Sequence, residues 1–580
     1  MTRLISYCIL YVCSVLSAYS FVPYVENGNP LRWNIETGTY HPNLVNPSTK
    51  AIRYFIGAET YSTGNRAAEL NAIRVSFDQW QSVPGTTLKF EEGGLLPGTL
   101  TIDLEDNTNV IFWTKTRFVA GNDMSGRAGF SSILYSVNNE ILQADIVLNG
   151  FETSWITDFT NTISASRFVE AVVCHEIGHF IGLDHTPVGG ATVIDGGGGI
   201  STEAGLSVDE IAAARYLYPA PGLSSSLGEI RGTVTKNGAP ILGAMVTAED
   251  MNGNVAAGTV TDASGNYALP MLSPGNYNVR VSPLDPASSS KNNSLIRGID
   301  IAFVPYNDAD TSFLATDNSN VVVTAGGMAT QSFAVTAGLP PFRISSISKP
   351  TPFTEADSLN RFAMSVRQGQ SNLFVGVSST TLPSDATLQI TGNGISTGPT
   401  IYKPNRFAGG IHLLSLQFSV SSNAIPGLRS FVVSRGGDRA YANGYLEILP
   451  PVADHNFDGL DDLFQRRYFA RFTAPEAASG SDPDGDRFGN GFEFRTGTDP
   501  TNPNSFSFLI QQIRISRGSA VVTFKSEAGK QYQLYFKEAL APSDDWAAVG
   551  QVKQATGDLT EIVDSGNSSG NRFYKLELLP

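Results

Sequence analysis

The chain has 580 residues, which is too many for one hydrophobic core, so we expect about four domains at the usual size of about 100–200 residues. Its formal net charge is −15, which argues against nucleic acid as a partner because phosphates need a basic surface. Charged residues make up only 16% of the chain, and the sequence after residue 220 is rich in Ser, Thr, Asn and Val without long helical periodicity. We therefore expect mostly β-structure there.

The first residues have the pattern of an export signal. Arg3 supplies a positive start, Leu4 to Leu16 is largely apolar, and Ala18-Tyr19-Ser20 offers small residues for cleavage. We expect residues 1–20 to be removed and the protein to be secreted, with association to a cell surface left open. No later apolar run approaches the roughly 20 residues that a membrane-spanning helix needs.

Cysteine usage limits how the exported chain is stabilised. Cys8 and Cys13 lie in the signal, so Cys174 remains alone and an internal disulfide is impossible. An acidic exported protein without disulfides needs other stabilising links, and bound calcium is a reasonable candidate.

Residues 21–220 form the only stretch with convincing helices. Apolar residues recur at helical spacing from Arg66 to Ser82, a second helical pattern runs from about Ser166 to Gly182, and a third begins at Ser207, with Glu210 completing a capping box. Strand-like runs lie between the first two helices, at Thr99 to Leu104, Val110 to Thr114 and Ile141 to Leu148.

The next part, residues 221–338, follows a linker rich in Pro, Gly and Ser and has the alternation of a small β-sandwich. Ile230, Gly232 and Val234 alternate, and Asn237-Gly238 is a strong turn signal. The segment resembles carboxypeptidase-regulatory-like, transthyretin-type domains, which implies a structural or binding appendage. The resemblance rests on Pro240, Gly243-Ala244, Thr261-Asp262, Gly265-Asn266-Tyr267 and Pro274-Gly275-Asn276-Tyr277.

Two further β-units are predicted. Residues 339–450 show the alternation Leu373/Val375/Val377 and Leu414/Leu416/Phe418/Val420, and residues 506–580 show Tyr532/Leu534/Phe536. Both patterns indicate sandwiches, and we assign them no chemistry of their own.

The segment His175-Glu176-Ile177-Gly178-His179 begins the main chemical motif. On a helix, His175 and His179 project from one face, so both imidazoles can reach one zinc ion at about 2.0–2.1 Å. Gly182 can take the left-handed conformation that turns the chain and brings His185 back as the third ligand. Glu176 is not needed as a ligand and can act as the general base on a zinc-activated water.

These residues resemble the metzincin signature, and Thr186 after the third histidine is similar to the matrixin branch. The similarity extends to Leu206-Ser207-Val208-Asp209-Glu210, to Leu217-Tyr218-Pro219, to Trp33-Asn34 and to Val83-Pro84-Gly85-Thr86. The resemblance implies a twisted sheet with three helices and a zinc-dependent endopeptidase activity. We therefore expect an α+β metzincin catalytic domain followed by several all-β sandwich domains.

Three departures from that family are visible. The methionine expected in a tight turn under the zinc is absent, and spacing from His185 places Val193 there. Only His41 is available as a further histidine in this domain, so the family's structural zinc is not expected. No cysteine is available for a latency propeptide, and Cys174 should point about 100° away from the ligand face as a buried small residue.

Residues 451–505 contain two acidic loops with the spacing of calcium ligands. The second loop carries Asp482, Asp484, Asp486, Asn490 and Glu493, with Arg487 where glycine is usual. The first loop carries Asp454, Asn456, Asp458, Asp462 and Gln465, with glutamine where a glutamate is expected, so we predict a weaker site. Gly497-Thr498-Asp499-Pro500 resembles the thrombospondin-type-3-like or dockerin-like linkers of modular bacterial exoproteins.

Two functions follow from the sequence. The first is a secreted zinc endopeptidase that cuts extracellular proteins or peptides, with β-domains that place it on a protein, polysaccharide or cell-surface ligand. The second is an extracellular binding or adhesive protein whose metalloprotease-like domain has lost turnover. Retention of Glu176 favours the enzyme. For substrate binding, Ala144 to Leu148 is either the edge strand that receives an extended peptide or an ordinary sheet strand.

Overall fold

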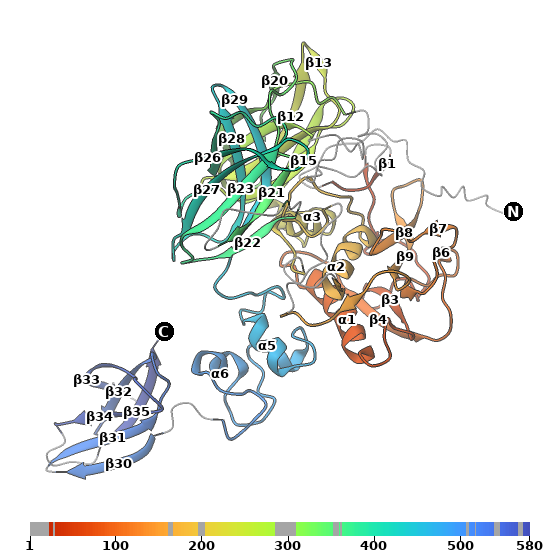
Figure 1. Ribbon diagram of the computed structural model, residues 1–580. Coiled ribbons are helices and arrows are strands. Elements are labelled where there is room, and N and C mark those ends of the chain that lie inside the picture. The colour runs from red at the N-terminus through yellow and green to blue at the C-terminus, as the bar shows by residue number, and fades with distance from the viewer. Residues whose placement is uncertain are drawn as a thin grey trace. The chain divides into compact units, whose positions relative to one another are not determined.

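The computed structural model (Figure 1) describes residues 22–26, 29–160, 166–194, 204–284, 309–351, 359, 362–505, 510–516, 518–538, 546–566 and 572–579. The predicted signal, residues 1–20, lies outside these residues. The chain divides into two compact units, Met1–Pro451 and Val452–Pro580. No helix among the described residues has the length and apolar character needed to cross a membrane.

The first unit begins with a mixed α/β domain built on a five-stranded sheet. Four strands run parallel, and only β8 is antiparallel to its neighbour. The strand order is β4 (Phe90–Leu96), β3 (Ile52–Gly57), β5 (Val110–Thr114), β9 (Ile141–Asn149) and β8 (Gly129–Tyr135). Because β9 lies between β5 and β8, the second of the two readings of Ala144 to Leu148 holds: it is an ordinary interior strand, and β8 occupies the edge.

The three predicted helices are present, as α1 (Arg66–Gln81), α2 (Val169–Phe180) and α3 (Val208–Leu217). Ser207 caps α3, and Glu210 completes the capping box. Helix α2 begins later than predicted because β11 (Arg167–Phe168) pairs with β10 (Trp155–Ile156).

The expected strand at Thr99 to Leu104 is wrong. Polar side chains from β9 hold this segment instead: Asp145 accepts a hydrogen bond from the Asp103 amide at 3.2 Å, and Gln143 donates to the Asp103 carbonyl at 2.6 Å. These side-chain bonds replace a backbone ladder.

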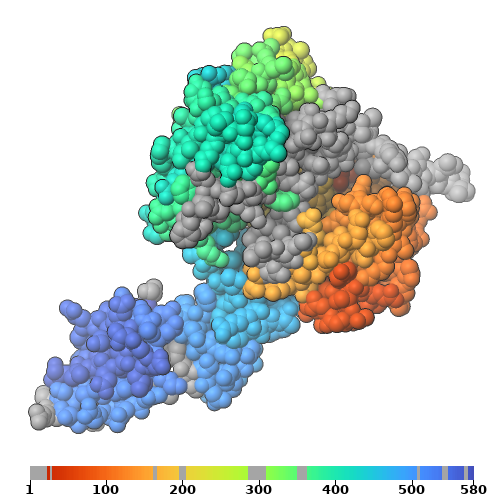
Figure 2. All heavy atoms as spheres, in the orientation of Figure 1, coloured from red at the N-terminus to blue at the C-terminus, as the bar shows by residue number. Residues whose placement is uncertain are grey.

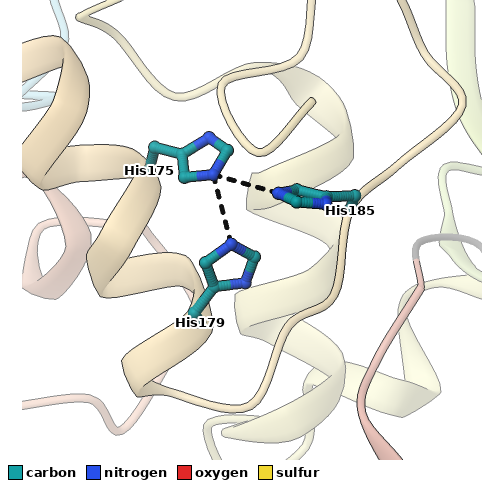
Figure 3. Close-up of side chains that lie close together, drawn as sticks. All are labelled: His175, His179 and His185. Atoms are coloured by element: carbon teal, nitrogen blue, oxygen red, sulfur yellow. Dashed lines mark hydrogen bonds between the residues drawn. The ribbon is translucent and has the colours of Figure 1, made fainter. Parts of the chain in front are cut away.

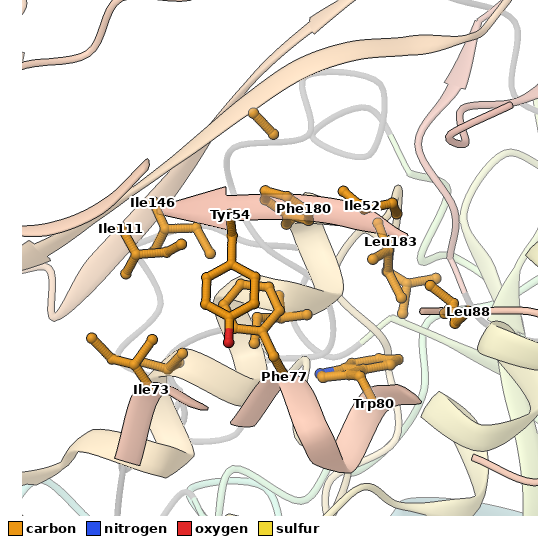
Figure 4. Packing of buried hydrophobic residues seen from close by; sticks show 14 of the residues in the cluster. Ile52, Tyr54, Ile73, Phe77, Trp80, Leu88, Ile111, Ile146, Phe180 and Leu183 are labelled. Carbon is orange, nitrogen blue, oxygen red and sulfur yellow. The ribbon is translucent and has the colours of Figure 1, made fainter. Parts of the chain in front are cut away.

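An aromatic core fixes α1 and α2 against one face of the sheet (Figure 4). Tyr54 of β3 stacks on Phe77 of α1 with ring centroids 3.8 Å apart, and Phe77 meets Phe180 of α2 edge-on at 5.9 Å. Trp80 of α1 donates its indole hydrogen to the Cys174 carbonyl at 2.9 Å, which satisfies a buried polar group inside the apolar layer. Helix α2, which carries two of the histidines, is thereby held in a fixed position. Small strand pairs complete this domain: β1 (Val25–Glu26) with β2 (Asn29–Pro30), and β6 (Phe118–Val119) with β7 (Asn122–Asp123).

The rest of the first unit consists of two β-sandwiches, each with its own apolar core. The Asn237-Gly238 turn has positive φ at both residues, as predicted for a tight hairpin. In the first sandwich one sheet contains β13 (Ala239–Pro240), β12 (Gly228–Lys236), β16 (Asn266–Leu272), β19 (Met328–Thr330) and β20 (Phe333–Val335), and the other contains β15 (Val255–Val260), β14 (Ala244–Asp250), β17 (Gly275–Pro283) and β18 (Thr316–Val323). A 3-10 turn, η2 (Leu223–Ser225), precedes them.

The second sandwich also has two sheets. One contains β21 (Ser346–Thr351), β23 (Leu373–Ser379), β27 (Ile411–Val420), β25 (Ile395–Thr397) and β26 (Ile401–Phe407); the other contains β22 (Met364–Arg367), β29 (Asp438–Leu449), β28 (Gly427–Arg435) and β24 (Thr387–Ile390). The predicted alternations in β23 and β27 point into the core between these sheets.

The second unit joins a helical segment to a third sandwich. Two short helices, α5 (Asp462–Tyr468) and α6 (Asn490–Thr496), flank the turn η3 (Pro475–Ala477). The sandwich has three strands in each sheet, β30 (Ile510–Ser516), β31 (Ser519–Lys525) and β34 (Leu559–Asp564) against β33 (Ala547–Gln554), β32 (Gln531–Lys537) and β35 (Phe573–Leu579). Its residues are drawn in blue in Figure 2, and the sandwich has an apolar core of its own. The mixed α/β domain followed by all-β sheets confirms the predicted fold class, while the individual domain boundaries stay predictions.

Candidate active site and metal centres

Helix α2 presents His175 and His179 on one face, one turn apart. The Nδ1 atom of His175 lies 2.8 Å from the Thr192 carbonyl, and Nδ1 of His179 lies 2.8 Å from the Leu183 carbonyl. A carbonyl oxygen only accepts, so both Nδ1 atoms carry the hydrogen and both Nε2 atoms keep a lone pair. Burial lowers the pKa of His179 well below its usual value, and the neighbouring His185 and His175 lower it further, which keeps the ring in the neutral form that binds metal.

The turn after α2 brings the third histidine back, as predicted. Gly182 has φ +107°, and a Cβ there would lie 2.2 Å from the Leu31 carbonyl oxygen, so only glycine fits. The chain near the N-terminus braces this turn. The Val22 carbonyl accepts from the Asp184 amide at 2.6 Å, and the Tyr24 amide donates to the Gly182 carbonyl at 2.9 Å.

The three imidazoles converge on one point (Figure 3). Nε2 of His175 lies 3.1 Å from Nε2 of His179 and 3.2 Å from Nε2 of His185. Nitrogen ligands at about 2.0–2.1 Å from a tetrahedral zinc ion stand about 3.3–3.4 Å apart, close to these values. The lone pairs of His175 and His179 cannot hydrogen-bond to each other and would repel at this distance, so the arrangement fits a cation between them.

Glu176 lies beside this cluster and is buried. The Ser131 hydroxyl of strand β8 lies 2.9 Å from Glu176 Oε2 and 2.8 Å from the Glu176 carbonyl. Burial raises the pKa of Glu176 to about 7, and the hydrogen bond from Ser131 and the charges of His185 and Arg127 act in the opposite direction. Such a carboxylate is suited to accept a proton near neutral pH.

Val193 stands where the family methionine is expected. It is buried in the catalytic core, and its carbonyl accepts from the Thr186 amide at 3.0 Å, directly after the third histidine. A Cβ on Gly178 would lie 2.5 Å from Val193 Cγ2, so valine packs directly on the backbone of α2. The floor of the site is therefore filled by valine.

Two further expectations concern Cys174 and His41. Cys174 is buried in α2 and forms no disulfide, which confirms its reading as a small core residue. His41 is exposed, and it belongs to neither of the two clusters of metal-ligating side chains found among the described residues.

Sequence patterns did not reveal two of the groups that shape the site. Thr192 acts through its backbone carbonyl, which leaves no side-chain signal. Ser131 is one of two adjacent serines in its strand, and only the pairing of β8 with β9 places it over Glu176.

A helix with two histidines, a glycine turn to a third and an adjacent buried glutamate define a zinc-dependent hydrolase centre. Comparison with protein families identifies it more closely. Residues 46–219 match Matrixin, and residues 229–298 match the Carboxypeptidase regulatory-like domain. The chain thus contains a matrixin zinc metalloendopeptidase domain, with His175, His179 and His185 as its metal cluster, followed by a carboxypeptidase regulatory-like domain.

No curated protein matches the chain. Similarities to solved structures are weak. The minor pilin GBS52 of Streptococcus agalactiae matches at 13% identity over 20% of this chain and 47% of its own length, with a TM-score of 0.13. The major pilin subunit BcpA of Bacillus cereus matches at 8% identity over 61% of this chain and 88% of its own, with a TM-score of 0.13. Fervidolysin from Fervidobacterium pennivorans matches at 12% identity over 39% and 31%, with a TM-score of 0.14. TM-scores this low carry no information about function.

The second acidic loop gathers three of its predicted ligands. Carboxylate oxygens of Asp482, Asp484 and Asp486 lie within 4.8 Å of one another. Asn490 and Glu493 of α6 are buried, and Asn490 Oδ1 and Glu493 Oε2 have no hydrogen-bond partner. Burial raises the pKa of Glu493 to about 7, and the charges of Asp484 and Asp486 raise it further. Unpaired buried oxygens next to clustered carboxylates are the donor set that a hard cation satisfies.

In the first loop, some of the predicted ligand atoms already have hydrogen-bond partners within the protein. Gln465 donates its amide hydrogen to Asp458 Oδ2 at 2.8 Å, and Asp462 pairs with His455. Asn456 Oδ1 and Asp462 Oδ1 are buried without partners. An amide and an imidazole thus occupy carboxylate oxygens that a cation would otherwise contact, and the weaker affinity expected for this loop stays a prediction.

Both loops have the same backbone conformation. In the first, φ is +58° at Phe457 and +81° at Gly459; in the second, φ is +77° at Gly485 and +79° at Arg487. Arg487 therefore adopts the left-handed conformation that glycine provides at the equivalent position of the first loop.

Proposed function

We propose that the protein is a secreted endopeptidase that hydrolyses peptide bonds of extracellular proteins, with Glu176 as general base. The observation that carries the proposal is the buried Glu176 carboxylate, held by Ser131, next to three convergent imidazoles. When bound, zinc supplies a Lewis acid that activates water and polarises the scissile carbonyl. Glu176 then accepts the proton of the attacking water and returns it to the leaving amine.

Strand β8 is our candidate for the substrate-binding edge. It is the last strand in the sheet, and its Ser131 contacts Glu176. An extended peptide that adds to this edge by backbone hydrogen bonds would pass across the general base. The amide and carbonyl groups of β8 would then supply orientation without strong side-chain selectivity.

We further propose that the acidic segment binds calcium, with Asp482, Asp484, Asp486, Asn490 and Glu493 as the stronger site. The support is the pair of buried, unpartnered oxygens on Asn490 and Glu493. Secretion rests on the sequence of residues 1–20, and a polysaccharide or cell-surface ligand of the β-domains stays a prediction.

The first test compares the wild type with Glu176→Ala and Glu176→Gln in a casein or gelatin cleavage assay, with zinc content measured on all three. We expect one catalytic zinc in each protein and a loss of activity in both variants of about a hundredfold or more, since general-base catalysis contributes about that much. Zinc binding without cleavage by the wild type would support the alternative, an extracellular binding protein with an impaired protease domain, for which the valine at position 193 is the motivating observation.

A further inference from the structure

The loop Thr186–Ile194, called here the support loop, connects directly to two metal ligands. It follows His185 in the chain, and its Thr192 carbonyl orients His175 through the 2.8 Å contact with Nδ1. The Thr186 amide donates a hydrogen bond to the Val193 carbonyl at 3.0 Å, which closes the base of the loop. The path of this loop therefore sets the orientation of one imidazole and the position of another.

The second sandwich covers the outer side of the support loop. The Gly189 amide donates to the Asn443 carbonyl at 2.9 Å. A Cβ on Gly189 would lie 2.2 Å from the Tyr445 ring, and one on Gly190 would lie 2.4 Å from Leu428, so two consecutive glycines let the sandwich approach the loop backbone.

The first sandwich contacts the same loop from β15. Val188 packs so closely on Gly258 that a Cβ there would lie 2.5 Å from Val188 Cγ2. The Gly258 amide donates to Asp209 Oδ1 at 3.1 Å, and the Asp209 carboxylate also bonds to the Thr186 side chain. Figure 1 shows α3, which carries Asp209, close to β15.

The side chains that make these contacts meet in one small buried apolar cluster. It contains two residues from the support loop and one from each sandwich: Val188, Ala191, Val255 and Leu428. The end of the loop, Ile194, belongs to the core of the second sandwich. A loop that contains two glycines loses much conformational entropy on ordering, and this burial offsets that loss.

We infer that the two sandwiches act as positioning elements of the zinc centre, with Leu428, Val255, Gly258 and the Asn443 carbonyl holding the support loop. In the family that the sequence resembles, a methionine supports the zinc site from beneath. Here the sandwiches supply part of that support from outside the catalytic domain. The inference rests on the proposed endopeptidase, and zinc retention tests it independently of cleavage.

The test uses the full chain and two matched truncations in the second sandwich. Leu428→Ala removes a side chain that contacts the support loop, whereas Leu388→Ala removes an equally buried leucine that belongs to the core of that sandwich and not to the cluster on the loop. We expect Leu428→Ala to lose zinc to a chelator about tenfold faster and to lower kcat with little change in KM, as outer-shell changes around metals do. Leu388→Ala should lower the unfolding temperature of the sandwich and leave both site properties unchanged.

A second variant serves if Leu428→Ala fails to fold. Gly258→Ala inserts a methyl against Val188 and should displace the support loop, and adding Val188→Ala to it should recover zinc retention in a double-mutant cycle. The inference would be overturned if both Leu428→Ala and Gly258→Ala retained zinc as well as Leu388→Ala does. If the wild type binds zinc without cleaving, while Leu428→Ala and Gly258→Ala lose zinc faster than Leu388→Ala, the proposed function fails and the inference stands.

Discussion

Asp145 is a carboxylate buried inside the catalytic sheet. Its oxygens accept hydrogen bonds from the amides of Val110 at 3.0 Å and Asp103 at 3.2 Å, which anchors the segment before β5. Burial nevertheless dominates and raises the pKa of Asp145 to about 8, with Asp106 and Asp103 adding to the rise. The group therefore couples the stability of the catalytic domain to pH.

The sign of that coupling follows from proton counting. Between about pH 4 and pH 8 the folded carboxyl holds a proton that the unfolded chain releases, so the free energy of unfolding falls as pH rises through this window. Asp145→Asn removes this contribution. In calorimetry, the difference in unfolding temperature, variant minus wild type, should become more positive from pH 5 to pH 8. A difference that does not change with pH would show that Asp145 is ionised in the folded protein.

Arg487 has the backbone conformation of a glycine. At φ +79° a side chain with a Cβ costs about 1 kcal/mol or more, and the equivalent position of the first loop is Gly459. Arg487→Gly should therefore raise the calcium affinity of the second loop, which calorimetric titration measures. Gly459→Ala is the reciprocal change and should weaken the first loop. A lower affinity in Arg487→Gly would mean that the arginine side chain contributes to the site.

At the scale of elements, the zinc helix and its floor are fitted to each other. A Cβ on Gly178 would lie 2.5 Å from Val193 Cγ2, so the valine side chain lies directly against the backbone of the helix. Val193→Met places a longer side chain in this filled space, and overpacking of this kind costs about 1–3 kcal/mol. We expect lower thermal stability and faster loss of zinc, measured with a chelator. Tighter zinc binding by Val193→Met would show that the site has space for the methionine of related enzymes.

The elements show which signals in the sequence were sufficient. Periodicity predicted α1, the capping box predicted α3, and histidine spacing predicted the metal cluster, because these depend on neighbours within a turn or two. The expected strand at Thr99 to Leu104 was wrong, and the sequence left open whether Ala144 to Leu148 lies at an edge or inside the sheet. Both depend on which strand pairs with which, and local patterns do not determine that pairing.

At the scale of the whole molecule, the two compact units differ in what stabilises them. The unit that starts at Val452 has a helical segment with buried oxygens that have no hydrogen-bond partner, among them Asn490 Oδ1 and Glu493 Oε2, and we propose that calcium satisfies them. Removing calcium at constant zinc should therefore expose residues 452–505 to proteolysis, while the catalytic domain stays resistant.

The matched control is Glu493→Gln, which keeps the side-chain shape and removes a charge. This variant should be cut within residues 452–505 even when calcium is present. Identical cleavage of the wild type with and without calcium would contradict the assignment of the site.

Separate β-units could be expected from the sequence, but the contacts of the sandwiches with the support loop could not. Their alternation predicts separate β-units, whereas the contacts of Val188 and Gly189 with Gly258 and Tyr445 arise from surfaces more than fifty residues apart in the chain. In the sequence, such contacts are visible only as small residues at the contact points. Glycines are common in any loop, so they do not reveal the contact.

Cys174 has a practical consequence of a different kind. It is buried in the zinc helix next to His175, and once the predicted signal is removed it is the only thiol in the chain. A thiol reagent can therefore modify the protein only when this helix opens. The rate of that single labelling event measures how often the catalytic core opens in solution, without any engineered probe.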